Sequence, residues 1–227
     1  MGGARGTAEK VGPEAPPKCD LCPRLVAYRH ENEAAEPDWF NGAVSSFGPA
    51  STRFLIVGLA PGRNGANRTG RPFTGDYAGD LLFATLLEYG FAKGTYAARP
   101  DDGFVLKNCM ISNSVRCVPP QNKPLPVEIN TCRRYLEARI ASLPNLEIML
   151  ALGRIAHDQA LTTLGVRKAL HPFAHGARHD LGPGPSGKSR VLYDSFHCSR
   201  YNTNTGRLTP DMFRSVFAAI KAELAAR

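Results

Sequence analysis

The stretch that decides the fold is Phe54–Leu82, with the sequence FLIVGLAPGRNGANRTGRPFTGDYAGDLL. Its apolar start, Phe54–Val57, predicts a short strand that is buried on both faces. A glycine-rich loop follows, and leucines at helical spacing from Leu81 to Leu87 predict a helix after it. A strand, a tight loop and a helix start place backbone N–H groups at the carboxyl edge of a sheet, where open α/β folds bind their ligands.

The glycine loop matches neither standard nucleotide-binding pattern. The dinucleotide motif GxGxxG fails because Gly58 is followed by Leu-Ala-Pro. The phosphate loop GxxxxGK[ST] is nearly matched at Gly65–Gly70, but Arg71 and Pro72 stand where lysine and a hydroxyl residue are required. The loop therefore predicts close approach of a ligand without identifying a nucleotide.

The composition indicates an ordinary soluble globular protein with an excess of basic over acidic residues. The chain has 227 residues, of which 43% are hydrophobic, and no apolar run approaches the roughly 20 residues of a membrane span. The first residues lack the apolar centre of a signal peptide, so we expect a disordered tail over 1–17, a single domain over 18–227 and a cytoplasmic, nucleoid-associated protein. A net charge of +8 favours a polyanionic partner, with nucleic acid first.

The six cysteines of a chain expected inside the cell favour metal or cluster binding over disulfides. Cys19 and Cys22 form a CxxC pair, whose spacing lets both sulfurs face one ion. With Cys117 and Cys132 they predict a four-cysteine site that clamps the N-terminal segment to the main body, with zinc and an iron–sulfur cluster as alternatives. The remaining two are expected to be ordinary buried thiols: Cys109 and Cys198.

Strands and helices are expected to alternate along the chain. After the first strand, further strands are predicted at 108–115, 146–152 and 190–196, with helices at 24–33, 77–89, 127–142, 153–165 and 209–226. This alternation predicts an α/β fold, a three-layer α/β/α sandwich with a central four-stranded, mostly parallel sheet.

Three evenly spaced histidines lie between the third and fourth predicted strands, in a region rich in glycine and proline. His171, His175 and His179 resemble a metal-binding set by their spacing alone. Pro172 and Gly176 deny them a common helix face, and no carboxylate accompanies them. We therefore interpret them as loop residues.

Polar residues follow three of the predicted strands. Since the carboxyl ends of parallel strands converge on one edge of a sheet, we expect these residues to meet in one pocket. It would offer the aromatic ring of Phe73, the amide of Asn113 and the imidazole of His197, together with the carboxylate of Asp76. A flipped nucleobase requires such groups: a stacking partner, hydrogen bonds to its edge, and stabilisation of charge on the leaving base.

Four motifs carry a resemblance to a known family: GLAPGRNGANRTGRPFTGD at 58–76, NSVRCVPPQNKP at 113–124, ALGRIAHD at 151–158 and HCSRYN at 197–202. With the cysteine spacing they span nearly the whole ordered chain. The sequence resembles the family 5 (type b) uracil-DNA glycosylases. The resemblance implies a monofunctional glycosylase of base excision repair, without lyase activity. It also selects iron–sulfur over zinc, and implies a 4Fe–4S cluster on these residues: Cys19, Cys22, Cys117 and Cys132.

The same resemblance implies roles for individual residues. Phe73 would stack on the extruded base, and Asn113 would bond its Watson–Crick edge. His197 would donate toward uracil O2 as negative charge builds there, with help from the amides of Gly62 and Arg63. A short segment would enter the duplex or hold its phosphates: Arg200, Tyr201 and Asn202. Further basic residues are expected to line the DNA face: Arg68, Arg71, Arg116, Lys123 and Arg207.

One position departs from the family pattern. Better-known relatives carry a polar catalytic side chain directly after the first strand, whereas Leu59 and Ala60 provide none. Because cleavage passes through an oxocarbenium-like sugar and an anionic base, stabilising both charges is the main task. We therefore assign Asp76 to orienting the water and countering the sugar cation. The missing polar side chain also predicts a roomy pocket that accepts hypoxanthine and other deaminated bases beside uracil.

Each of these residues also has a plainer interpretation. Asp76 occupies the position of a helix N-cap, Phe73 could be core, Asn113 could satisfy backbone groups at the strand end, and His197 could be structural. Two other functions fit the sequence as well. One is a non-catalytic nucleic-acid-binding module with a structural Cys₄ metal, and the other is an α/β enzyme that acts on a free nucleotide. We expect a monomer that acts on single- or double-stranded DNA without a membrane partner.

Overall fold

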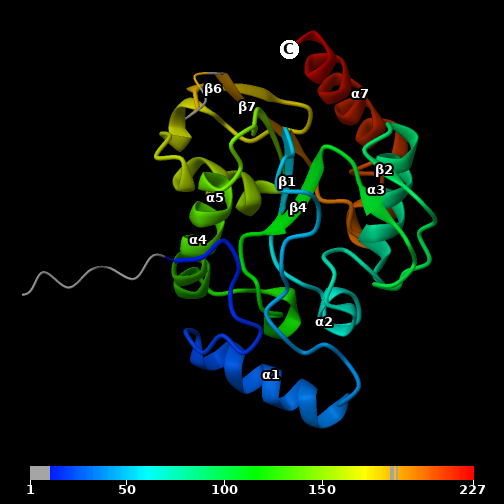
Figure 1. The fold of residues 1–227 in the computed structure, drawn as a ribbon, viewed down its shortest axis with the longest axis vertical. Helices are drawn as coiled ribbons and strands as arrows, with labels where there is room; N and C mark the ends of the chain where they lie inside the picture. Colours follow the sequence, from blue (N-terminus) through cyan, green and yellow to red (C-terminus); the bar gives the residue numbers. More distant parts are fainter. Residues whose placement is uncertain (1–10, 185–186, 188) are drawn as a thin grey trace, which may run out of the picture.

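The computed structural model describes residues 11–184, 187 and 189–227 (Figure 1). The elements follow one another in this order: α1 (Pro23–Ala35), β1 (Phe54–Gly58), α2 (Ala66–Thr69), α3 (Tyr77–Glu88), β2 (Ala92–Lys93), β3 (Val105–Leu106), β4 (Cys109–Asn113), the 3₁₀ turn η1 (Pro120–Asn122), α4 (Pro126–Ala141), β5 (Ile148–Leu152), α5 (Arg154–Thr163), the 3₁₀ turn η2 (Lys168–Leu170), β6 (Arg178–Pro183), β7 (Ser189–Ser195), α6 (Arg200–Asn204) and α7 (Pro210–Ala226).

The main sheet has the strand order β4-β1-β5-β7-β6. β1 pairs in parallel with β4 and β5, and β5 pairs in parallel with β7. Every residue of β1, β4 and β5 is buried, as the apolar runs of β1 and β5 predict for strands covered on both faces. The four parallel strands therefore end at the same edge of the sheet.

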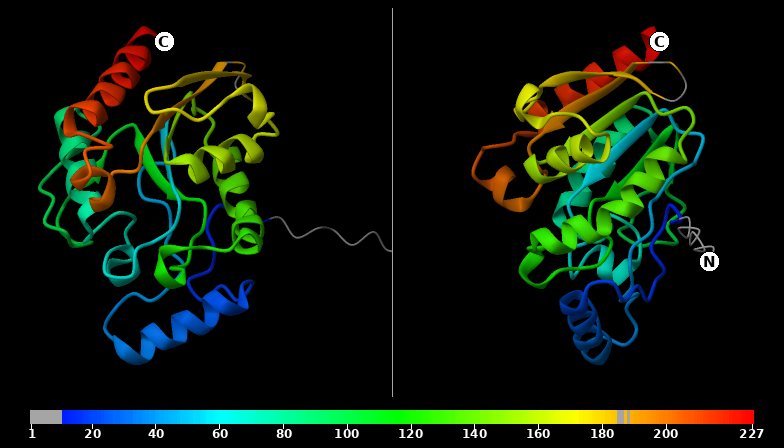
Figure 2. Two further views of the ribbon diagram at one scale, coloured as in Figure 1. Left: turned by 180° about the vertical axis from the view of Figure 1, so that it is seen from behind. Right: turned by 90° about the vertical axis from the view of Figure 1, so that its left-hand side faces the viewer.

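Helices cover both faces of this sheet (Figures 1 and 2). α4 and α5 bury Leu136, Ile140 and Leu161 against one face. α3 and α7 bury Phe83 and Phe217, with their apolar neighbours, against the other. The predicted three-layer α/β/α sandwich with a mostly parallel sheet is confirmed.

The sheet has five strands, and the sequence predicts only four of them. The fifth, β6, is an edge strand that pairs antiparallel with β7 through Arg178, His179 and Asp180. Its residues alternate between exposed and half-buried, because the strand covers the margin of the sheet and contributes little to the core. An edge strand of this kind lacks the apolar run that marks the buried strands.

The first described residues also differ from the expected tail over 1–17. Ala15 is buried, and the carboxylate of Glu14 forms ion pairs with Arg116 and Arg139. Residues 13–17 therefore pack against the domain, because two buried guanidinium groups need an anionic partner. Residues 1–10 of the expected tail lie outside the described residues.

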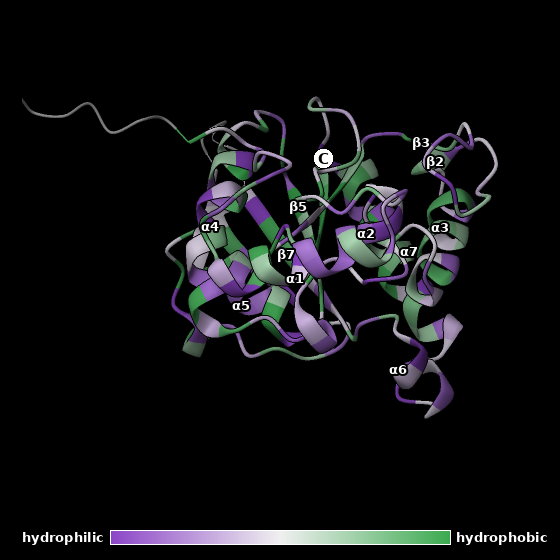
Figure 3. Ribbon diagram, turned by 90° about the horizontal axis from the view of Figure 1, so that it is seen from below, coloured by the Kyte–Doolittle hydropathy of each residue, from purple (hydrophilic) through white to green (hydrophobic). Residues whose placement is uncertain are grey.

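Two helices stand apart from the sandwich. α1 lies across one end of the molecule, and its ribbon is mostly hydrophilic to neutral in colour (Figure 3). The short α6 projects from the body of the fold (Figures 2 and 3). None of the helices in the described ranges is long and apolar enough to cross a membrane.

Candidate active site

A cavity of about 580 Å³ lies at the carboxyl edge of the sheet. Its walls come from the loop after β1, the start of α3, the end of β4, the η1 turn and the residues after β7. Ligand sites in proteins usually enclose about 300–1,000 Å³, so the cavity can hold a molecule of nucleoside size. Because three of the parallel strands end at this cavity, one ligand can contact residues from distant parts of the sequence.

The three predicted base-binding side chains meet in this cavity. The cavity is lined by all three: Phe73, Asn113 and His197. The ring centroids of Phe73 and His197 lie 5.9 Å apart, with 27° between the ring planes. Gly58, at the end of β1, makes this possible. A Cβ there would lie 2.4 Å from Asn113 Oδ1 and 2.8 Å from the Phe73 ring. The absence of a side chain on β1 therefore lets the amide and the ring approach each other.

Phe73 is both a core residue and a wall of the cavity. It is only 7% exposed and belongs to the hydrophobic cluster under α3. Its backbone has φ of 56°, in the left-handed region that bulky residues rarely adopt. Strained conformations of this kind concentrate at functional sites, where the surrounding structure holds them in place.

Asn113 does not serve the backbone at the strand end. The carbonyl of Gly58 accepts hydrogen bonds from Ser114 N at 2.9 Å and from Ser114 Oγ at 3.0 Å. Asn113 Oδ1, by contrast, is buried with no hydrogen-bond partner among the described residues. A buried polar atom without a partner costs stability unless something binds it, so this oxygen is available to a ligand.

Asp76 caps a helix, as its plainer interpretation predicts, and it also lines the cavity. It is the N-cap of α3, and its Oδ1 accepts the Gly79 N–H at 3.1 Å. Its other oxygen lies over the glycine loop, 2.5 Å from where a Cβ of Gly65 would stand. Burial raises the pKa of this carboxyl, which the hydrogen bonds from the helix start partly oppose. The carboxylate is therefore a partly desolvated negative charge at the cavity wall.

His197 lies in the cavity wall as a neutral imidazole. Burial lowers its pKa to about 4, so it carries no charge at neutral pH. Among the described residues its ring has no hydrogen-bond partner, although its backbone oxygen accepts from Asn202 Nδ2 at 2.8 Å. A neutral imidazole can still donate one N–H to an oxygen that gains negative charge.

The glycine loop offers backbone donors next to Asp76. Gly62 and Arg63 line the cavity, and neither amide N–H donates to another part of the described chain. The Arg63 side chain turns away toward α1, where its Nε donates to Asn32 Oδ1 at 2.7 Å and its guanidinium lies 5.0 Å from the Trp39 ring centre. The backbone of Arg63, and not its side chain, is therefore placed to serve a ligand.

Two polar cavity residues are notable among those that were not predicted from the sequence. Tyr77 is exposed at the start of α3, with the Arg200 guanidinium 5.1 Å from its ring centre. Asn122 lies in η1 and has φ of 57°, next to Gln121 with φ of 55°. Two consecutive left-handed residues without glycine are a strained turn. The Pro-rich motif around them was the only sequence signal that could have indicated it.

Two arginines assigned to the DNA face are buried instead. Arg71 is 5% exposed and forms a double ion pair with Asp102, at 2.8 Å for each contact. Arg116 is also buried and pairs with Glu14 at 3.0 Å. Both assignments were wrong, because a carboxylate elsewhere in the chain neutralises each cation inside the fold.

The other predicted DNA-binding residues lie on the surface or close to it. Arg68 is exposed, with its Nε donating to Asn64 O at 2.9 Å. On α6, Arg200 is exposed and lines the cavity, and Tyr201 is 72% exposed. Asn202 instead points back to the His197 backbone, so its visible contact supports the loop that carries the imidazole.

The four predicted cysteine ligands converge on a second, smaller cavity. Cys19, Cys22, Cys117 and Cys132 line it together, beside Tyr135 of α4. Burial raises the pKa of Cys117 to about 12 and that of Cys132 to about 11, so bare thiols would be neutral there. Metal coordination takes such groups as thiolates and so compensates for their burial. The predicted buried thiols, Cys109 and Cys198, lie outside this cavity, in the core.

The spacing of the four sulfurs bears on which metal group fits. Among the described residues, the set of three metal-ligating atoms that all lie within 4.8 Å of one another belongs to His157, His179 and Asp194. No three of the four cysteine sulfurs are therefore that close to one another. A single tetrahedral zinc with Zn–S bonds of about 2.3 Å would hold its sulfurs about 3.8 Å apart. The four thiols thus share one cavity without forming a group of that compactness.

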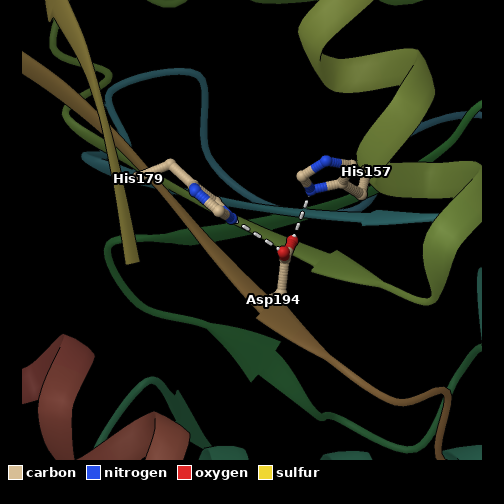
Figure 4. A group of neighbouring side chains, drawn as sticks. All are labelled: His157, His179 and Asp194. Carbon is tan, nitrogen blue, oxygen red and sulfur yellow. Dashed lines mark hydrogen bonds and ion pairs between the residues drawn. The ribbon is translucent and has the colours of Figure 1, made fainter. Parts of the chain in front are cut away.

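The histidine group lies on the other side of the sheet from α7, between α5, β6 and β7 (Figure 4). His157 Nδ1 lies 2.7 Å from one oxygen of the fully buried Asp194, and His179 Nε2 lies 2.9 Å from the other. The interpretation of His179 as a loop residue without a carboxylate was therefore wrong. Its partner is Asp194, 15 residues later in the chain, which only the pairing of β6 with β7 brings close.

Comparisons with known proteins agree with this geometry. The model of the uracil DNA glycosylase superfamily matches residues 45–221. The type-5 uracil-DNA glycosylase of Thermus thermophilus is 44% identical over 209 residues, covering 89% of this chain and 92% of that protein. The type-5 enzyme of Mycobacterium tuberculosis is 38% identical, over 89% of this chain and 77% of that protein. That of Pyrobaculum aerophilum is 34% identical, over 90% of this chain and 88% of that protein.

Proposed function

The chain belongs to the type-5 uracil-DNA glycosylases of the uracil-DNA glycosylase superfamily, and from this premise we propose how its residues divide the reaction. It is a hydrolase that cleaves the N-glycosyl bond of uracil in DNA. We propose that it flips the damaged base out of the duplex into the 580 Å³ cavity. The observation that carries the proposal is the meeting of Phe73, Asn113 and His197 around that cavity, with Asn113 Oδ1 buried and unpaired.

Three groups bind the flipped base in this scheme. Phe73 provides the stacking surface, held by its strained backbone. The amide of Asn113 pairs with the base edge, and the unpaired Oδ1 gains the N–H that it lacks in the free enzyme. His197 donates an N–H toward the oxygen on which negative charge develops, with the amides of Gly62 and Arg63 close by.

Asp76 acts on the sugar side of the bond. Its carboxylate orients the attacking water and counters the positive charge of the oxocarbenium-like sugar. Two features support this role: Asp76 lines the cavity, and its second oxygen is directed over the glycine loop and away from the helix cap. No polar side chain at Leu59 or Ala60 competes for the water.

The reaction stops at the abasic site. A glycosylase with lyase activity uses an amine to form a Schiff base with the sugar, which breaks the strand. No lysine is among the described residues that line the cavity. This supports a monofunctional enzyme that releases the base and leaves the backbone intact.

The same cavity supports a range of deaminated bases. A purine such as hypoxanthine needs more room than uracil and offers a similar carbonyl-bearing edge. Ala60 and Leu59 leave the wall near β1 without a polar group that would select against it. We therefore include hypoxanthine among the substrates.

We further propose a 4Fe–4S cluster on Cys19, Cys22, Cys117 and Cys132. The four thiols line one cavity, no three of their sulfurs lie within 4.8 Å of one another, and Arg116 N donates to Cys132 Sγ at 3.3 Å. When bound, the cluster supplies a covalent clamp between the N-terminal segment and α4. The cysteines and their hydrogen bonds hold it in place, and no step of base release passes through it.

The test is incubation with single- and double-stranded oligonucleotides that carry one uracil or one hypoxanthine. We expect free base and a strand that breaks only after alkali treatment. Binding of DNA without base release would favour a non-catalytic binding module, and a strand broken without alkali would contradict the monofunctional assignment. Gel filtration checks the accompanying proposal that the enzyme acts as a monomer on nucleoid DNA, since one chain provides every cavity residue.

A further inference from the structure

The end of β7 is held by a segment that the proposed reaction does not use. Residues 171–179, which carry the three evenly spaced histidines, run along the end of this strand, and Gly176 N donates to Asp194 O at 2.9 Å. His197 lies three residues after Asp194, on the backbone that leaves β7. Whatever fixes this backbone therefore fixes the imidazole in the cavity.

His175 contacts the residue directly before His197. Its Nδ1 accepts the backbone N–H of Phe196 at 3.2 Å, and its Nε2 lies 3.2 Å from the carbonyl oxygen of Met212. An amide N–H only donates and a carbonyl only accepts, so Nδ1 carries the lone pair and Nε2 carries the proton. His175 is thus a neutral imidazole in one tautomer, and it joins the residue before His197 to the first turn of α7.

The other face of β7 is held through the side chain of Asp194. His157 Nδ1 faces Asp194 Oδ1, and its Nε2 lies 2.9 Å from the carbonyl oxygen of His171. The ring of His157 therefore links the backbone of His171 to the side chain of Asp194. The 2.7 Å separation fits a shared proton, whereas a metal with bonds of about 2.1 Å to each atom would hold them about 3 Å apart.

We propose that His175 is a positioning residue for His197. It contacts neither DNA nor base, and acts by fixing the backbone at Phe196 from the α7 side while Asp194 holds the strand from the α5 side. The ring of His175 also stacks on that of Phe196, with centroids 5.1 Å apart and 20° between the planes. The inference rests on the proposed role of His197 as donor to the leaving base.

Three substitutions of one residue separate this role from general stability. His175→Asn places an oxygen near the former Nδ1, where it can accept the Phe196 N–H. His175→Gln reaches toward Met212 but leaves that N–H without an acceptor, and His175→Ala removes both contacts. Since a misplacement of about 1 Å can cost about a hundredfold in rate, we expect the alanine and glutamine variants to be about tenfold to a hundredfold slower. The asparagine variant should stay within about threefold of the parent enzyme.

The measurements are single-turnover release of uracil from an oligonucleotide, and affinity for a duplex carrying an abasic-site analogue. Affinity should change by less than about twofold in all three variants, because none of them removes a DNA contact. A double variant with His197→Ala provides the decisive readout. If His175 acts through His197, adding His175→Ala to His197→Ala slows release no further.

Three results would overturn the inference alone: an unimpaired His175→Ala enzyme, equal losses in the alanine and asparagine variants, or a double variant slower than His197→Ala by the full factor. Each is read against an impaired His197→Ala enzyme. If His197→Ala itself releases uracil at the parental rate, the proposed role of His197 fails, and the role of His175 fails with it.

Discussion

The proposed substrate cavity and the four-cysteine cavity share one stretch of chain yet differ in how their charged and polar groups are partnered. Asn113 and Cys117 are four residues apart, at the exit of β4. In the substrate cavity, Asn113 Oδ1 is buried without a partner. Around the cysteines, each cation has an acceptor: Arg24 pairs with Glu128, Arg29 donates to Cys19 O, and Arg116 and Arg139 pair with Glu14.

This difference follows from what each site must do. A site that binds and releases a substrate has to keep donors and acceptors unpaired in the free enzyme, at a cost in stability. A site for a resident group keeps its contacts permanently, so its surroundings can be fully paired. Strained backbone and an unpaired amide oxygen therefore mark the proposed substrate cavity. Around the cysteines each of these guanidinium groups has an acceptor, although the Nε atoms of Arg29, Arg116 and Arg139 are themselves buried without a partner in the described part of the chain.

The largest expected effect is on the rate, through Asp76. Asp76→Asn removes the negative charge but keeps an acceptor for the Gly79 N–H, so the cap of α3 survives. We expect single-turnover release of uracil to fall by about 10²–10⁴-fold, with DNA affinity and melting temperature almost unchanged. Single-turnover kinetics and a binding titration measure the two effects separately.

Asp80→Asn is the matched control, because Asp80 is an exposed carboxylate in the first turn of the same helix. It should excise uracil at the parental rate. Unchanged cleavage by Asp76→Asn would refute the assigned role and leave Asp76 as a helix cap only.

The second effect is on the cluster and on stability, through Cys117. Cys117→Ser should lose most of the iron and the absorbance near 400 nm, and should melt at a lower temperature, because binding free energy at such a site is folding free energy. Iron analysis and thermal melting measure both. Cys198→Ser is the control, since its hydroxyl can keep the hydrogen bond to Ala78 O. Equal iron content in the two variants would contradict the ligand set.

The third effect separates a buried arginine from an exposed one. Arg71→Ala leaves Asp102 buried without its cation, so we expect the free energy of unfolding to fall by about 3–5 kcal/mol. Arg68→Ala should change stability by less than about 0.5 kcal/mol, and should weaken DNA binding while reducing its salt dependence. Denaturant unfolding and binding at several salt concentrations distinguish them. Loss of DNA affinity without loss of stability in Arg71→Ala would contradict the buried pairing.

The smallest effect is the pH dependence of base release. His197, with a pKa of about 4, stays neutral between about pH 5 and pH 8, so it contributes no change in rate over this range. Burial raises the pKa of Asp76, and protonation removes the charge that it supplies. The rate should therefore fall as the pH falls, and this acid limb should be absent from the residual activity of Asp76→Asn. A limb that persists in that variant would assign it to another group.

The sequence predicted that residues from three strand ends would line one cavity, because simple topology brings them together. Buried parallel strands are recognisable from uninterrupted apolar runs, and their ends must converge. Phe73, Asn113 and His197 could therefore be placed together without any knowledge of their side-chain contacts. The convergence of the four cysteines on one cavity was also predicted, because a CxxC pair needs further thiols to complete a site; their role as ligands stays a prediction.

Contacts between distant charges could not be predicted in this way. Arg71 lies 31 residues from Asp102 and Arg116 lies 102 residues from Glu14, and a basic residue in a loop has the same sequence signal whether solvated or paired. The pair of His179 and Asp194 was missed because β6 lacks the apolar pattern of a strand. Each of these errors concerns a partner that only the finished fold supplies.

Gly58 has a consequence for how this protein can vary. Any side chain there would collide with both Asn113 and Phe73. Neither neighbour could move aside without leaving the position from which it is proposed to bind the base. In a library of all single substitutions selected for repair, this position should tolerate nothing but glycine, although it contacts no DNA. The active site therefore depends on the absence of a side chain at this position as strictly as it depends on its reactive side chains.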